Sequence, residues 1–167
     1  MLLQTVVQRL TEAGVEAALG GSGLLCSLGL VDSVRDWDLT TDAPASQVEA
    51  ALAGLVWERS VFGDGPYATA YRLSLKTGDR EIDLMGQFAI RTETGVCRIP
   101  TVVCSVWQGM PVGSPEAWAV AYRLMGRHPK ADLLAGYIRQ HGARRDVVER
   151  LLLEPLPAPV RSEVESW

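Results

Sequence analysis

Two segments with strand-like patterns, residues 34–39 and 80–85, each carry a pair of acidic residues two positions apart. Asp36 and Asp38 form one pair, and Glu81 and Asp83 form the other. If each pair lies on a strand, its two side chains point to the same face of a sheet, about 6–7 Å apart along the chain. Carboxylates gathered on one face repel one another unless a cation lies between them. The pairs therefore predict an oxygen-rich site for Mg²⁺ or Mn²⁺.

A glycine-rich turn precedes the first acidic pair. Gly20, Gly21 and Ser22 lie between residues 15–19, which resemble a short strand, and the apolar residues 24–30, which resemble a helix. Glycine lets backbone N–H groups approach a ligand closely, and a helix N-terminus favours an anion. The Ser22 hydroxyl is a candidate partner for a phosphate oxygen. A triphosphate with its metal ions would satisfy both the turn and the acidic pairs.

The spacing of apolar residues predicts the elements that must position these groups. The clearest helix start has Ser114 at the N-cap, Pro115 next and Glu116 in the first turn. Expected helices cover residues 2–13, 24–30, 46–56, 114–125, 129–142 and 143–153, and expected strands cover residues 15–19, 34–39, 67–76, 80–85, 95–99 and 101–107. This order predicts an α/β (α+β) fold with a small mixed β-sheet, helices packed on one side of it, and C-terminal helices.

The composition narrows the classes of function. The 167 residues suit one compact domain, and 47% hydrophobic with 22% charged residues argues for a packed core rather than disorder. A net charge of −4 and a pI near 5.2 argue against long nucleic acid as the partner. Three cysteines without a C-x-x-C pair indicate neither a disulfide framework nor a zinc knuckle. A polar N-terminal helix and the lack of a long apolar run predict a soluble cytoplasmic protein with no membrane partner.

The turn and the acidic pairs together resemble the signature of the DNA polymerase β-like nucleotidyltransferase superfamily. Residues 19–22 (LGGS) and 36–39 (DWDL) are similar to the glycine turn and the Asp-x-Asp strand of that family, in the same order. Asp83 matches the third carboxylate, which the family carries on a neighbouring strand, and Glu81 is its nearest rival. The resemblance covers about residues 15–86.

Two branches of that superfamily share features with the chain. Residues 34–44 are similar to the tRNA CCA-adding branch, but the arginine-rich helix and long helical domains of that branch are missing. Residues 113–130 are more similar to small antibiotic nucleotidyltransferases, such as the lincosamide- and aminoglycoside-modifying enzymes. We therefore expect a nucleotidyltransferase catalytic domain over residues 1–112 and a C-terminal helical subregion over 113–154. Residues 155–167 hold three prolines without periodicity, so they are expected to form a flexible tail.

The resemblance implies metal-dependent transfer of a nucleotidyl group from a nucleoside triphosphate, with ATP as first choice. Asp36 and Asp38 would hold two metal ions that clamp the α-phosphate. Asp83 would complete the catalytic-metal site and accept the proton of the attacking hydroxyl. Gly20, Gly21 and Ser22 would bind the nucleotide, with Gly21 and Ser22 at the β- and γ-phosphates.

Other residues near these motifs each have two interpretations. Lys130, near a helix start, is a candidate contact to the triphosphate, and a solvated lysine is the alternative. Arg35 and Arg72 either reach phosphates or form surface salt bridges. Trp118 and Tyr122 share one helix face at i, i+4 spacing, which is typical of core packing and leaves base stacking as the alternative.

The acceptor of the transferred group follows from the resemblance and from the size and acidity of the chain. A hydroxyl of a small molecule such as an aminoglycoside or lincosamide is the first choice. The alternatives are an RNA- or protein-directed nucleotidyltransferase of toxin–antitoxin type and a catalytically degenerate nucleotide-binding module. A homodimer is expected by resemblance alone.

Overall fold

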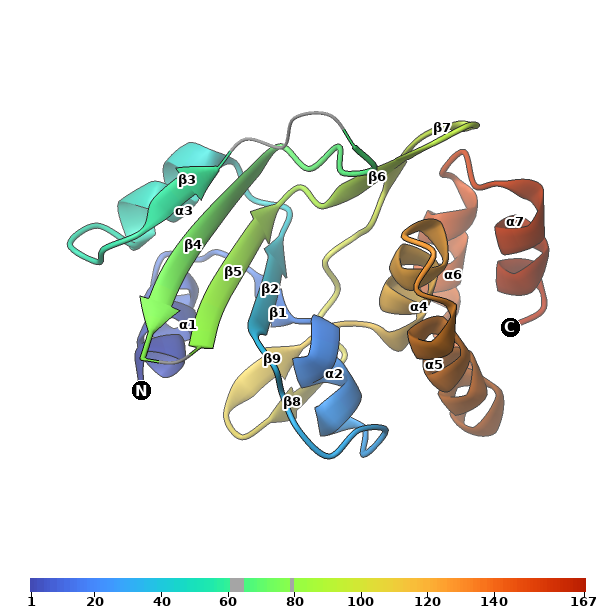
Figure 1. Ribbon diagram of the computed structural model, residues 1–167, viewed down its shortest axis with the longest axis horizontal. Coiled ribbons are helices and arrows are strands. Elements are labelled where there is room, and N and C mark those ends of the chain that lie inside the picture. The colour runs from blue at the N-terminus through green and yellow to red at the C-terminus, as the bar shows by residue number, and fades with distance from the viewer. Residues whose placement is uncertain (61–64, 79) are drawn as a thin grey trace.

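A mixed β-sheet forms the centre of the computed structural model, which describes residues 1–60, 65–78 and 80–167 (Figure 1). Within these ranges the sheet has seven strands in the order β3-β4-β5-β2-β1-β9-β8. Neighbours β2 and β5 run parallel, as do β1 and β9, and the other neighbouring pairs are antiparallel. The strands are β1 (Ala17–Leu19), β2 (Trp37–Thr41), β3 (Glu58–Ser60), β4 (Tyr71–Thr77), β5 (Arg80–Gly86), β8 (Ser105–Trp107) and β9 (Met110–Val112).

Apolar and polar side chains alternate along β4 and β5, so the sheet has one apolar face and one polar face there. Leu73 lies opposite Leu84 in the antiparallel register, and both are fully buried. One position along, Ser74 lies opposite Asp83 on the other face. Because successive side chains of a strand point to opposite faces, the apolar set packs inward and leaves the polar set facing out.

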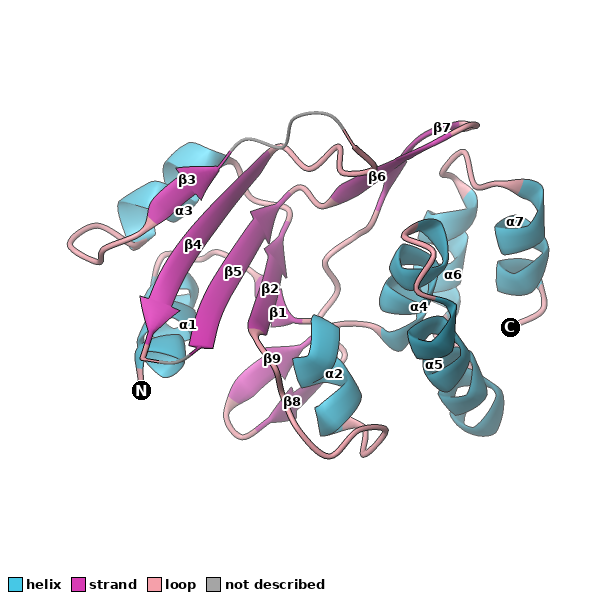
Figure 2. Ribbon diagram, in the orientation of Figure 1, coloured by secondary structure: helices cyan, strands magenta, loops and turns pink. Residues whose placement is uncertain are grey.

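The described residues form seven helices: α1 (Leu2–Glu12), α2 (Gly21–Ser27), α3 (Ala45–Ala51), α4 (Pro115–Leu124), α5 (His128–His141), α6 (Arg145–Leu152) and α7 (Ala158–Glu165). Helices α1 and α3 lie behind the sheet, and α4 to α7 form a group beside it (Figure 2). Helix α4 begins as expected, since the Ser114 hydroxyl accepts a hydrogen bond from the Ala117 N–H at 2.9 Å. The α+β architecture expected from the sequence is confirmed.

Several strands differ from the sequence prediction. The hairpin of β6 (Ala89–Thr92) and β7 (Gly95–Arg98) forms a separate two-stranded sheet, of which only the second strand was expected. The expected strand over residues 101–107 is reduced to β8. Its first part leaves the sheet because the Thr101 N–H donates to the Asp42 carboxylate instead of to a neighbouring strand. None of the helices in the described parts of the chain is long and apolar enough to cross a membrane.

The prediction of a flexible tail over residues 155–167 is wrong. Helix α7 packs against the rest of the molecule, with Val164 fully buried and Leu156 almost so. Pro157 occupies the N-cap and Pro159 lies within the first turn, where a missing N–H costs nothing. The prolines therefore start this helix instead of preventing it.

One hydrophobic core joins the sheet to the C-terminal helices. It extends without interruption from Leu39 and Leu84 in the sheet to Trp118 and Tyr122 in α4 and Leu134 in α5. The division into residues 1–112 and 113–154 stays a prediction, but any such boundary is crossed by this shared core.

Candidate active site

Two of the expected acidic residues lie side by side on neighbouring strands. Asp38 of β2 and Asp83 of β5 are direct partners in the parallel register. Both line a cavity of about 430 Å³ on the face of the sheet opposite to α1 and α3. Glu81, the rival of Asp83, lies opposite Lys76 and is not among the residues that line the cavity. The register therefore brings Asp83, and not Glu81, next to Asp38.

Asp36 reaches the same cavity from a loop. The expected strand over residues 34–39 begins only at Trp37, so Asp36 lies one residue ahead of β2 and is exposed. The reason is local, because the backbone of this segment is bound to Ser22. The Ser22 hydroxyl accepts from the Arg35 N–H at 3.1 Å and donates to the Asp36 carbonyl at 3.3 Å.

The glycine turn brings the start of α2 close to Asp38. The Gly20 N–H donates to the Asp38 carbonyl at 2.8 Å. Gly21 has φ +54°, and a Cβ atom there would overlap the Asp38 carboxylate. A Cβ atom on Gly20 would overlap the Trp118 ring. The two glycines therefore allow close packing against Asp38 and Trp118, and the Ser22 hydroxyl orients the segment that carries Asp36. Phosphate binding by these three residues stays a prediction.

Asp83 is held by a basic side chain of the neighbouring strand. Nε and Nη2 of Arg72 donate to the two carboxylate oxygens of Asp83 at 2.8 and 2.6 Å. The Ser74 hydroxyl donates to the same carboxylate at 2.7 Å. Arg72 thus forms a salt bridge, one of the two interpretations its sequence position allowed, and it does so inside the candidate site.

The charges of the three carboxylates are only partly compensated. Burial, followed by the neighbouring charges of Asp83 and Asp36, raises the pKa of Asp38 to about 6. Lys130 and Arg127 act in the opposite direction, with a smaller effect. An uncompensated group of carboxylates at one end of a cavity is the setting in which a divalent cation binds.

The carboxylate oxygens of the site suit Mg²⁺ or Mn²⁺ as ligands, but one ion pair must open before all three carboxylates can bind the ion. Within the described ranges, no three His, Cys, Asp or Glu side chains are already grouped to hold a metal ion. Asp83 is paired with Arg72, and Asp36 lies on an exposed loop. Asp36, Asp38 and Asp83 would therefore hold the ion after Asp83 has exchanged its partner.

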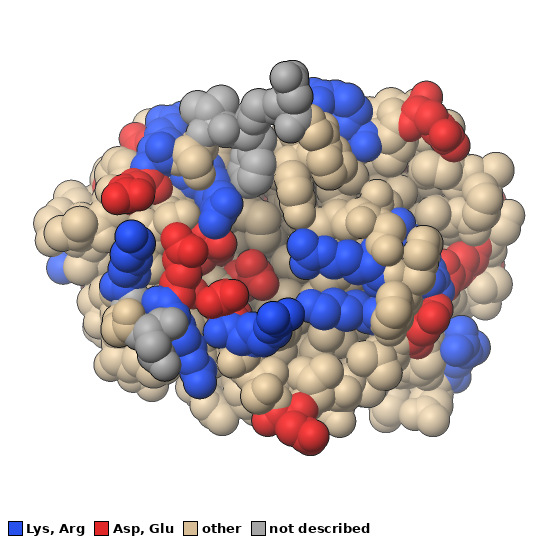
Figure 3. Space-filling view, viewed as in Figure 1, with Lys and Arg blue, Asp and Glu red and all other residues tan. Residues whose placement is uncertain are grey.

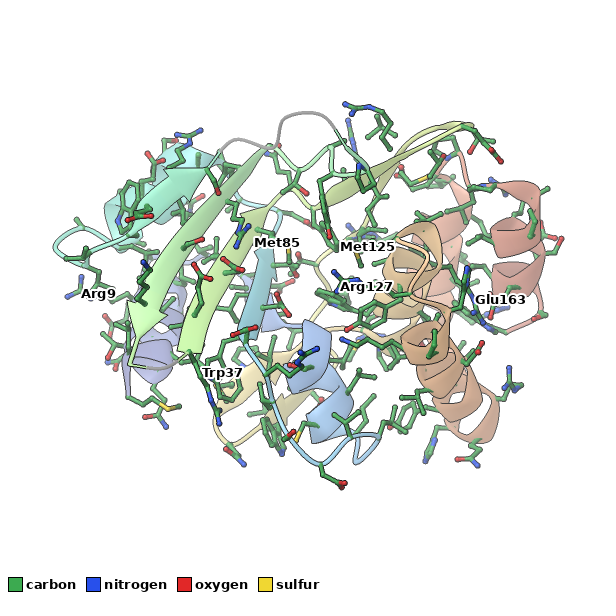
Figure 4. The ribbon with its side chains drawn as sticks, viewed as in Figure 1. Arg9, Trp37, Met85, Met125, Arg127 and Glu163 are labelled. Carbon is green, nitrogen blue, oxygen red and sulfur yellow. The ribbon has the colours of Figure 1, made fainter. Side chains whose placement is uncertain are left out.

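The opposite wall of the cavity comes from the C-terminal helices and is basic. Arg127, at the N-cap of α5, and Lys130, in its first turn, line the cavity, and Arg35 approaches from the loop before β2. Figure 3 shows long basic side chains next to a group of acidic ones, and Figure 4 shows Arg127 on the helical side and Met85 on the sheet. Burial and the charge of Arg127 lower the pKa of Lys130. An acidic wall facing a basic wall suits a metal-bound polyphosphate.

Sequence reasoning missed Arg127. It lies between Gly126 and His128 at the turn from α4 to α5, where the pattern shows only a helix boundary. The available signal was the pair of basic residues, Arg127 and Lys130, at the start of one helix, a place where cations are otherwise unfavourable.

Comparisons with known proteins give structural neighbours only. No protein-family description matches the chain, and no curated protein sequence matches it. A candidate nucleotidyltransferase from Thermotoga maritima superposes with a TM-score of 0.60 at 22% identity, over 84% of this chain and 92% of that one. The chain has the nucleotidyltransferase fold. ANT(2″)-Ia in complex with adenylyl-2″-tobramycin superposes with a TM-score of 0.56 at 18% identity, over 99% and 95% of the two chains.

Proposed function

We propose that the protein is a metal-dependent nucleotidyltransferase that moves a nucleoside monophosphate group from a nucleoside triphosphate, ATP as first choice, to a hydroxyl of a small molecule. One observation carries this proposal. Asp38 and Asp83 are in register on adjacent parallel strands and, with Asp36, face Arg127 and Lys130 across one cavity. The cavity volume of about 430 Å³ lies within the range typical of small-molecule sites.

Each wall of the cavity has a separate task in this proposal. Asp36, Asp38 and Asp83 hold Mg²⁺ or Mn²⁺, which when bound supplies charge neutralisation at the transferred phosphoryl group. Arg127 and Lys130 bind the phosphate oxygens of the triphosphate and keep the α-phosphate facing the sheet. Fixed positive groups on one side and carboxylates on the other orient the triphosphate, and such positioning is the main source of rate enhancement in phosphoryl transfer.

The transfer step needs a base and a leaving group. The acceptor hydroxyl attacks the α-phosphorus, its proton passes to the Asp83 carboxylate, and the bond to pyrophosphate breaks. Pyrophosphate leaves past Arg127 and Lys130. Asp83 can take the proton only after its ion pair with Arg72 has opened, so Arg72 is free to contact the triphosphate at that stage.

A small-molecule acceptor is supported by the comparison with ANT(2″)-Ia. That protein was solved with an adenylylated tobramycin and matches nearly the whole of both chains. The acceptor of this chain remains to be found among hydroxyl-bearing small molecules, with aminoglycosides and lincosamides first. The competing functions are transfer to RNA or protein, and nucleotide binding without transfer. None of these functions requires a homodimer.

Labelled ATP tests the proposal directly. The protein is incubated with α-labelled ATP, Mg²⁺ or Mn²⁺, and either a panel of hydroxyl compounds or a cell extract. Asp38→Asn is the test variant, and Asp32→Asn, which changes an exposed carboxylate outside the cavity, is the control. Label in small products that is lost in Asp38→Asn alone supports the proposal. Label in macromolecules favours the RNA- or protein-directed function, and binding of ATP without transfer favours the degenerate module. Full transfer by Asp38→Asn rejects the assigned site.

A further inference from the structure

Tyr122 lines the cavity, and its hydroxyl is buried without a hydrogen-bond partner in the described part of the chain. The side chain is 1% exposed, and its oxygen has no partner among the described residues. A buried hydroxyl without a partner is unfavourable, and such groups are rare in folded proteins. Thr101 Oγ1 and Trp167 Nε1 are also unpaired, but neither residue lines the cavity, whereas Tyr122 does.

Aromatic packing fixes the position of this hydroxyl. The Tyr122 ring lies 5.6 Å from the Trp118 ring at 58°, and Trp118 lies 5.6 Å from Phe88. Trp118 in turn packs on Gly20, where a Cβ atom would overlap its ring. The hydroxyl is therefore held in place relative to the glycine turn and to Asp38, before any ligand binds.

Two cations share the cavity wall with Tyr122. Lys130 Nζ lies 5.4 Å from the centroid of the Tyr122 ring, and Arg127 lines the same cavity. Burial, followed by the charge of Asp38, raises the pKa of the Tyr122 hydroxyl, so it stays protonated and acts as a donor. A donor next to an ammonium and a guanidinium group matches an anionic oxygen. A neutral hydroxyl or a base edge would leave both cations uncompensated.

We propose that the Tyr122 hydroxyl donates a hydrogen bond to a phosphate oxygen of the bound triphosphate, in one anion-binding group with Arg127 and Lys130. The ligand class is a polyphosphate. Only the statement that this polyphosphate carries a nucleoside rests on the proposed function.

Tyr122→Phe tests this assignment because it removes one oxygen and keeps the ring. Affinities for MgATP, inorganic tripolyphosphate and adenosine are measured by calorimetry, and unfolding in urea is measured without ligand. Tyr137→Phe is the control, since Tyr137 stacks on His141 at 4.1 Å outside the cavity. We expect the dissociation constants of Tyr122→Phe for MgATP and tripolyphosphate to rise roughly 10- to 100-fold, the usual loss for a hydrogen bond to a charged group. We expect its stability without ligand to be unchanged or higher.

Three results would overturn the assignment. Unchanged affinity for both phosphate ligands means that the hydroxyl does not contact them. A clear loss of stability without ligand means that the hydroxyl has a structural partner. An equal loss of affinity for adenosine means that it contacts the nucleoside.

The assay also separates this inference from the proposed function. Binding of tripolyphosphate that depends on Tyr122, in a protein that transfers no label, supports the inference and rejects the function. Transfer of label by a protein whose Tyr122→Phe variant binds MgATP like wild type supports the function and rejects the inference. A wild-type protein that binds neither phosphate ligand rejects both.

Discussion

Without a metal ion, the negative charge of Asp38 is unfavourable in the folded protein. Its pKa rises from the ordinary 3.8 to about 6, first because of burial and then because of Asp83 and Asp36. Between these two pH values the folded chain binds more protons than the unfolded chain, so the free energy of unfolding falls as pH rises. Above about pH 6 the whole penalty is present. A shift of roughly two pH units corresponds to about 3 kcal/mol.

Asp38→Asn is therefore expected to stabilise the metal-free protein at pH 8 by about 2–3 kcal/mol, because it removes the buried charge. The difference from wild type should shrink as pH falls from 6 to 4 and vanish below pH 4. Urea unfolding in EDTA at several pH values measures it, with Asp32→Asn as control. A difference that is constant over this range would mean that the Asp38 carboxylate keeps an ordinary pKa.

In the proposed function, Arg72 competes with a metal ion for Asp83. Its guanidinium occupies both carboxylate oxygens, so a cation that needs Asp83 must displace it. We expect Arg72→Gln to bind Mn²⁺ without nucleotide about tenfold more tightly, since both a competing ion pair and a nearby positive charge are lost. Free Mn²⁺ measured by electron paramagnetic resonance during a titration gives the affinities.

The control for Arg72 is Arg59→Gln on the neighbouring strand β3. Arg59 pairs with Glu49 at 2.8 Å outside the cavity, so its removal should leave Mn²⁺ affinity unchanged. Weaker Mn²⁺ binding by Arg72→Gln would contradict the idea of competition and would make Arg72 a support of the metal site.

The spacing of residues predicted part of the site and could not predict the rest. Asp38 and Asp83 were expected on one sheet face because strand periodicity needs only local information. Their direct pairing depends on the register of β2 and β5, and the partner of Asp83 depends on β4. The unpaired hydroxyl of Tyr122 is invisible in the sequence, where its i, i+4 relation to Trp118 is that of an ordinary core pair.

At the level of elements, the turn into α2 depends on two different properties of Gly21. Its φ of +54° disfavours any residue with a Cβ atom, and the atom itself would overlap the Asp38 carboxylate. Gly29, at the far end of α2, has φ +70° with open space around it. A substitution at either glycine would therefore strain the backbone, but only Gly21 contacts the site.

We expect Gly21→Ala and Gly29→Ala each to lose about 1–2 kcal/mol of stability from backbone strain. Only Gly21→Ala should also lose binding of MgATP, by at least about tenfold, because the Asp38 carboxylate is pushed from its place. Urea unfolding and calorimetric titration measure the two effects. Equal MgATP affinity in both alanine variants would show that the close approach of Gly21 to Asp38 has no role in binding.

The strands and the helix that were not predicted from the sequence were missed for related physical reasons. Strand β3 is exposed along its whole length and, in the part of the chain that the structure describes, pairs only with β4, so it carries no apolar alternation. Strand β9 has only three residues, and one of them is Pro111, a residue type that argues against a strand in the sequence. Helix α7 follows prolines that predicted a loose segment, although Arg123 binds Glu163 of this helix at 2.8 Å and ties it to α4. Each element depends on a distant partner that local patterns do not reveal.

The whole molecule is a sheet and a helical group that share one core and one cavity. The order of helices and strands was enough to predict the α+β class, because amphipathic patterns and a glycine turn are local signals. The docking of α4 and α5 beside the sheet was beyond that information, since it is decided by contacts such as Trp118 on Gly20. The cavity lies at this junction, with Asp38 and Asp83 on one side and Arg127 and Lys130 on the other.

This arrangement predicts that the chain unfolds in a single cooperative transition, with or without ligand. Trp37 lies in the sheet and Trp118 in α4, and both are buried in the same core. Two variants, each keeping only one of these two among the five tryptophans of the chain, therefore report on the two parts separately. Their fluorescence transitions should coincide with the loss of secondary structure measured by circular dichroism. MgATP at 100 times its dissociation constant should shift both transitions equally, by about 2.7 kcal/mol, because in the proposed site the ligand contacts both walls. Two separate transitions, of which MgATP shifts only one, would show that the sheet and the helices are independent units and that the cavity between them is not the nucleotide site.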